Sequence, residues 1–75
     1  MSDIQSVVFF ENKGWNNQLA KLWLQFHKFH PIKPVDTHLN NELRYRLTDP
    51  TKYSRFISKK LPVGINLIIG FKKKK

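Results

Sequence analysis

The residues of this chain best suited to chemistry are cationic, and their spacing suits phosphate binding. Arg44 and Arg46 flank Tyr45 in the alternating segment Glu42 to Leu47. Alternate side chains of a strand share a face, so the two arginines would project on one side, about 7 Å apart. That spacing is comparable with the distance between successive phosphates on a nucleic-acid strand. Because a guanidinium group binds phosphate through a planar, two-pronged set of donors, this pair is the first candidate for a binding site. Tyr45 would then face the core.

Other cations could extend this site. The lysine run at positions 72–75 could add an electrostatic arm that is indifferent to base sequence. An alternative is a solvated sheet face whose charges block edge-to-edge pairing with other strands. The candidate nucleic-acid-binding residues are Arg44, Arg46, Arg55, Lys59, Lys60, Lys72 and Lys73.

The charge balance points to an acidic partner. Fourteen Lys and Arg face five Asp and Glu, which gives a formal charge of +9. Without the four terminal lysines this charge is still +5, so the body of the chain is itself basic. A body of this charge attracts polyanions, and nucleic acid, DNA or RNA, is the favoured partner. Binding to a membrane is disfavoured, because the basic and apolar residues do not form one long amphipathic helix.

Catalysis and metal binding have little support in the sequence. The five carboxylates are scattered, so no acid and base are paired, and no nucleophile-elbow glycine pattern surrounds Ser54 or Ser58. His27, His30 and His38 lack the further ligands, such as thiolates, that would complete a zinc site. We therefore expect a protein that is not an enzyme and holds no metal or cofactor.

Hydrophobic periodicity predicts an α+β fold with one helix packed on a small, mainly antiparallel sheet. The helix follows Asn16 or Asn17 and runs to about His27 or Phe29. We place His27 on its apolar, half-buried side. Ile4 to Phe10 is apolar on both sides, which favours an interior strand. The remaining predicted elements are a hairpin of residues 35–39 and 42–47 around Asn40 and Asn41, an irregular segment 52–61, and a last strand 65–71. The irregular segment could hold a short strand or a single helical turn.

Length and composition predict a single domain over residues 1–71, followed by a disordered lysine tail at 72–75. The chain has no cysteine, so its stability must come from apolar packing rather than disulfides. The start of the sequence has no basic region and no long apolar run, which argues against secretion. We expect an intracellular location in a host, in the cytoplasm or the nucleus, or a place in a virion.

A set of short motifs runs through most of the chain. Its residues are Ile4-Gln5-Ser6-Val7-Val8-Phe9, Trp15, Ala20, Trp23-Leu24, His27, Pro31-Ile32-Lys33, Asp36, Arg44-Tyr45-Arg46, Asp49-Pro50, Phe56, Gly64-Ile65 and Ile68-Ile69-Gly70. This set resembles a module found in uncharacterised proteins of tailed phages and giant DNA viruses. The resemblance covers roughly Ile4 to Gly70 and implies a viral origin and an independently folding unit, but no activity. It would place any shared surface at Arg44-Tyr45-Arg46 and Asp49-Pro50.

Two functions remain open from the sequence. The first is a small basic protein that contacts the nucleic-acid backbone largely without sequence specificity, and that could compact or accompany a viral genome. The second is a viral structural or protein-interaction module, whose partner would be a virion protein or a second copy of the chain. It would use Val7 and Phe9, near Ile68, if these residues form an exposed apolar patch.

Overall fold

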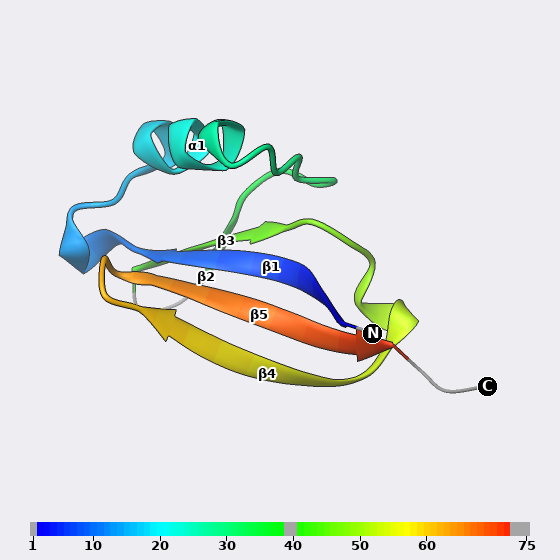
Figure 1. Cartoon of the computed structure of the whole chain (residues 1–75). Coiled ribbons are helices and arrows are strands. Elements are labelled where there is room, and N and C mark those ends of the chain that lie inside the picture. The colour runs from blue at the N-terminus through cyan, green and yellow to red at the C-terminus, as the bar shows by residue number, and fades with distance from the viewer. Residues whose placement is uncertain (1, 39–40, 73–75) are drawn as a thin grey trace.

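The computed structural model describes residues 2–38 and 41–72 as one α-helix, two short 3-10 helices and a single sheet (Figure 1). This agrees with the predicted α+β class. In chain order the elements are β1 (Ser2–Phe10), η1 (Glu11–Lys13), α1 (Asn17–Phe26), β2 (Asp36–His38), β3 (Glu42–Arg46), η2 (Pro50–Lys52), β4 (Tyr53–Leu61) and β5 (Ile65–Lys72).

The sheet is built around β1. Its strand order is β2-β3-β1-β5-β4, and every neighbouring pair is antiparallel. Val7 and Val8 point to opposite faces of β1 and are 0% and 2% exposed. β1 lies between β3 and β5 and pairs with both of them. The predicted interior position of this strand is therefore confirmed.

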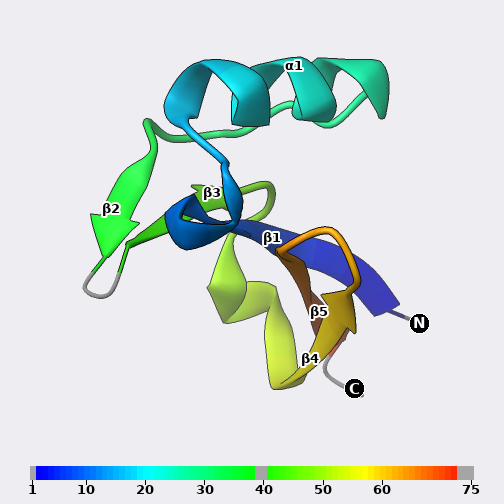
Figure 2. The ribbon, with the colours of Figure 1, turned by 90° about the vertical axis from the view of Figure 1, so that its left-hand side faces the viewer.

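The helix α1 covers one face of the sheet (Figures 1 and 2). Its N-cap is Asn16, whose side-chain oxygen accepts a hydrogen bond of 2.8 Å from the backbone N–H of Leu19. It ends at Phe26, and Lys28 then adopts a positive φ of 60°. His27 is exposed rather than half-buried as predicted, because it lies past the last helical residue. Its ring centroid lies 4.0 Å from that of Trp23.

The core lies between α1 and the sheet and is centred on Phe9. The ring of Phe9 contacts those of Trp15, Trp23 and Tyr45 at centroid distances of 4.9, 5.6 and 5.5 Å. Aromatic pairs at these distances stabilise a core beyond their buried area. The fully buried members are Val7, Phe9, Ala20, Leu24, Leu43, Tyr45 and Ile65. Val7 and Phe9 are therefore not the exposed patch on which the protein-interaction hypothesis depended.

Two predictions about the C-terminal third are wrong. Residues 53–61 form the nine-residue strand β4 rather than an irregular segment. They pair with β5 from Tyr53–Lys72 to Leu61–Ile65, with a shift of register between Tyr53 and Arg55. β4 lies at the edge of the sheet and is exposed on both faces along most of its length. An edge strand of this kind needs no alternation of polar and apolar residues, so its sequence shows no clear period. Lys72 belongs to β5 rather than to a tail, and residues 73–75 lie outside the described residues.

The predicted hairpin is present in shorter form. β2 and β3 pair from Asp36–Arg44 to His38–Glu42. Asn41 has a positive φ of 61°, as predicted for a turn asparagine. Asn40 lies outside the described residues.

Candidate nucleic-acid interface

The face of the sheet opposite α1 carries Arg44 and Arg46. Tyr45 is 2% exposed and points into the core, so its two neighbours on β3 point the other way. Arg44 pairs with Val8 of β1, and Arg46 pairs with Ser6. We call this surface the basic face and define it by Arg44, Arg46, Lys33 and Lys60. The predicted division of β3 into a core side and an arginine side is confirmed.

Two adjoining hollows on the basic face share both arginines. The first has a volume of about 370 Å³ and is lined by Arg44, Arg46 and the segment 33–35, which contributes Lys33. The second, of about 270 Å³, is lined by Arg44, Arg46, Pro50, Phe56 and Ile68 together with Gln5 and Ser6. Pro50 begins η2, which lies on the side of the sheet away from α1 (Figure 2). The arginines are thus set in a concave surface rather than on a flat one.

Lys33 was absent from the predicted site and is brought there by the connection between α1 and β2. The backbone N–H of Ile32 donates a hydrogen bond of 2.9 Å to the carbonyl of Arg46, which fixes this connection to the edge of β3. Pro31 and Pro34 restrict φ on either side and favour an extended chain. Two prolines around a lysine indicated an extended segment in the sequence, but no local signal indicated which strand it would meet.

The contacts of the two arginines are described for all neighbouring side chains except that of Asp36, a residue that pairs with Arg44 across β2 and β3. Among the side chains that the structure describes, neither Arg44 nor Arg46 forms an ion pair with a carboxylate. The Nε of Arg44 is buried and has no hydrogen-bond partner in the described part of the chain. Buried polar groups in folded proteins are nearly always hydrogen-bonded, so an unused guanidinium donor beside a hollow is a feature expected of an anion site.

Three carboxylates lie near these cations: Asp36 is the cross-strand partner of Arg44 on β2, Glu42 shares the arginine side of β3, and Asp49 lies beyond Arg46. Asp49 precedes η2, and its Oδ1 accepts hydrogen bonds from the backbone N–H of Thr51 at 3.0 Å and from the hydroxyl of Thr51 at 2.9 Å. These bonds lower the pKa of Asp49, and the positive charges of Arg46 and Lys33 lower it further. Asp49 is therefore ionised and interacts with Arg46 and Lys33 through long-range electrostatic attraction. It forms no ion pair with either of them in the described structure.

The other predicted cations do not all gather on the basic face. Lys60 does, because it belongs to the cross-strand row that runs from Arg44 through Val8 and Asn66, about 14 Å away across the sheet. Arg55 and Lys59 lie on the opposite face of β4, since they pair with Phe71 and Leu67.

Arg55 and Lys72 each contact another side chain. The guanidinium carbon of Arg55 lies 4.5 Å from the ring centroid of Phe71, in a cation–π contact. Lys72 forms an ion pair of 3.6 Å with Asp3. Lys73 lies outside the described residues. Of the seven predicted binding residues, Arg44, Arg46 and Lys60 therefore share the basic face. Lys72 points to the same side of the sheet, because it alternates with Asn66 along β5, but its amine pairs with Asp3.

The chain matches no known family model, and no curated protein or solved structure is significantly similar to it. The resemblance to a viral module therefore stays a prediction, and the proposals below depend on the geometry of this structure alone.

Within residues 2–38 and 41–72, no three His, Cys, Asp or Glu side chains come together in a way that could hold a metal ion. In the same residues no helix has the length and apolar character needed to cross a bilayer.

Proposed function

We propose that this protein binds nucleic acid through phosphates held on its basic face, with Arg44, Arg46 and Lys33 as the principal contacts. The observation that carries the proposal is the meeting of three cations around one hollow, from two segments separate in sequence. Both arginines lack ion pairs among the described side chains. Arginine suits such a surface because its fork of donors matches the geometry of a phosphate group.

The proposed contacts select for a phosphate backbone rather than for a base sequence. Contacts to phosphate fix the position of a protein on nucleic acid but do not read the sequence. The cations project from a strand and from a connection held at the edge of the sheet, so neither is a helix placed to enter a major groove. Binding should be largely independent of sequence and should weaken steeply as salt rises.

The proposal is tested by two double variants of equal charge. Arg44→Gln with Arg46→Gln removes two cations from the basic face, whereas Arg55→Gln with Lys59→Gln removes two from the opposite face. Hydrogen bonds to charged groups contribute about 1.5–3 kcal/mol each, so the first variant should weaken binding by at least roughly tenfold at low salt. The second should change affinity much less, because only the net charge falls.

Fluorescence anisotropy with a labelled oligonucleotide measures both variants against the wild type. Equal losses in the two variants would show that net charge, not the basic face, determines binding. No binding by the wild-type protein at low salt would remove the proposal.

A second function, as a protein-interaction module, is favoured by a different surface. Leu19, Leu22 and Phe26 on α1 are 45%, 56% and 84% exposed. Their spacing along the helix places them on one side of it, away from the sheet. An exposed apolar surface of this kind often contacts a partner or a second copy. A protein that fails to bind nucleic acid and self-associates in sedimentation would favour this function over the first.

A further inference from the structure

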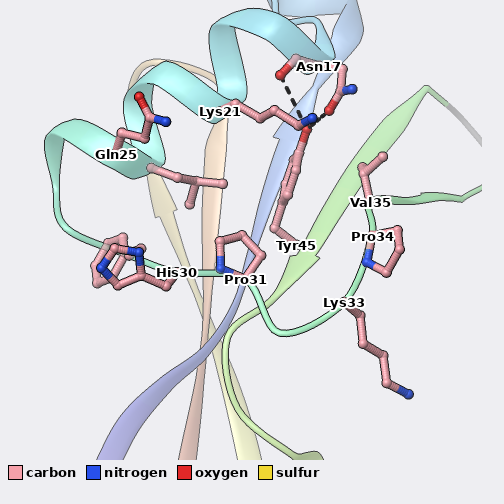
Figure 3. Close-up of a pocket in the computed structure, with 11 residues that line it drawn as sticks. Asn17, Lys21, Gln25, His30, Pro31, Lys33, Pro34, Val35 and Tyr45 are labelled. Atoms are coloured by element: carbon pink, nitrogen blue, oxygen red, sulfur yellow. Dashed lines mark hydrogen bonds between the residues drawn. The ribbon is translucent and has the colours of Figure 1, made fainter.

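A larger pocket lies on the other side of the connection that carries Lys33. It has a volume of about 620 Å³ and lies between α1, the segment 29–35 and Tyr45 of β3 (Figure 3). Its walls are tied together by backbone hydrogen bonds. Phe29 N–H donates to the carbonyl of Leu24 at 2.8 Å, and Ile32 N–H donates to that of Arg46 at 2.9 Å. The volume is within the range of sites that bind small organic ligands.

The lining of this pocket suits a flat ring that carries hydrogen-bond acceptors on its edge. Leu24, Phe29 and Val35 supply apolar surface, while Lys21 and Gln25 supply polar groups from α1. Lys21 extends from the helix toward Tyr45 (Figure 3). Neither Asp nor Glu lines the pocket. The hydroxyl of Tyr45 donates its hydrogen bond to the side chain of Asn17, so it is not free to donate to a ligand.

The pocket is continuous with the basic face. Lys33, Pro34 and Val35 line both this pocket and the hollow that holds Arg44 and Arg46. The stem of Lys33 borders the pocket, and its amine points away from it (Figure 3). A nucleotide with its base in the pocket would therefore direct its phosphate toward Lys33 and the arginines beyond.

We infer that the pocket accepts one unstacked base of a single-stranded nucleic acid whose phosphates lie on the basic face. This inference rests on the proposed function and adds that single strands are preferred. Bases of a duplex are stacked and paired, so they cannot enter such a pocket without being flipped out, whereas single strands expose them. Phe29 offers an aromatic ring to the base, and rings of this kind bind bases with little regard to sequence.

The test compares two variants that each lose one positive charge, one within α1 and one just after its C-terminal end. Lys21 lines the pocket and Lys28 does not. Lys21→Gln should weaken binding of a single-stranded oligonucleotide roughly tenfold, while Lys28→Gln should have a smaller effect. The two variants should bind a duplex equally, because the duplex contacts only the basic face. Circular dichroism checks that both variants retain the fold.

A second experiment adds a free nucleoside monophosphate and tests whether the pocket itself binds a nucleotide. The monophosphate should shift the NMR signals of Lys21 and Phe29, and inorganic phosphate alone should not. The inference is overturned if the mononucleotide leaves these signals unchanged and the two lysine variants bind single strands equally. The proposed function would survive that result if the Arg44 and Arg46 double variant still lost affinity. Shifts of the pocket signals without binding of any strand would assign the pocket to free nucleotides and remove the proposed function.

Discussion

At the level of single residues, the segment Arg44-Tyr45-Arg46 joins stability to the binding that we propose. Tyr45 packs against Phe9 and hydrogen-bonds to Asn17 at the start of α1, so β3 is anchored to the helix. Burial raises the pKa of its hydroxyl above the ordinary value for tyrosine, so the hydroxyl is held more firmly as a hydrogen-bond donor. Because the backbone between the two arginines is held by this buried ring, their positions are set before a ligand arrives. Preorganisation of this kind reduces the entropy lost on binding.

The pKa of Asp49 provides a test at this scale. We expect NMR titration to give a pKa below the ordinary value, because two hydrogen bonds from Thr51 favour the carboxylate. Thr51→Val should raise the pKa part of the way, since the hydroxyl donor is lost while the backbone N–H remains. Arg46→Gln should raise it less, because the charge of Arg46 is a smaller cause than the hydrogen bonds.

The same shift sets a direction for stability. A carboxyl group with a lowered pKa in the folded state stabilises the protein above its unfolded-state pKa, and this contribution is lost as pH falls through the folded-state value. Denaturation in acid should therefore begin at a higher pH in Thr51→Val. A pKa for Asp49 at or above the ordinary value in the wild-type protein would contradict this interpretation.

The arginine pair could be predicted from sequence, whereas the complete site could not. The alternation of residues 42–47 separates Tyr45 from its two neighbours without any tertiary information. Lys33 joins them only because the chain after α1 returns to the edge of β3, a long-range contact that leaves no local pattern. Arg55 and Lys59 were misplaced for a related reason, since their face depends on the register of β4 with β5.

At the level of elements, the packing of β4 on β5 depends on a glycine. A Cβ added at Gly70 would lie 2.5 Å from Cγ of Tyr53, so the ring of Tyr53 occupies the space that a side chain would need. The hydroxyl of Tyr53 forms hydrogen bonds with Asp3 at 3.0 Å and Thr48 at 2.7 Å. These bonds hold the ring in place, so it cannot easily move aside.

Gly70→Ala should therefore lower the free energy of unfolding by about 1–3 kcal/mol, the usual cost of an overpacked site. Ser58→Ala on the exposed part of β4 should change it by less than about 0.5 kcal/mol. Urea denaturation followed by tryptophan fluorescence measures both variants. Equal stabilities for the two would mean that Tyr53 does not pack over Gly70.

The sequence predicted most elements because most have one buried and one exposed side. α1 and β3 show the expected periods, and β1 was placed inside the sheet by its two apolar faces. β4 was missed because neither of its faces is covered along most of its length. The end of β5 was missed because Lys72 is ordered by pairing with Tyr53 and by the ion pair with Asp3, both of which are distant in sequence.

At the level of the whole molecule, one sheet separates a packing side from a charged side. α1 covers one face and forms the core with it (Figure 2). The basic face, with its two hollows, lies on the opposite side. The formal charge of +9 supplies a general attraction for nucleic acid. The geometry adds a particular place where three cations surround one hollow. We therefore propose that the position of a cation on the basic face, and not the net charge alone, determines whether it contacts phosphate.

The salt dependence of binding tests this claim most directly. The slope of log affinity against log salt counts the phosphates that a protein neutralises, at about 0.7 for each contact to a single strand. Arg44→Gln with Arg46→Gln should make the slope shallower by about 1.4, while Arg55→Gln with Lys59→Gln should leave it close to that of the wild type. The same slope for both double variants would contradict the account.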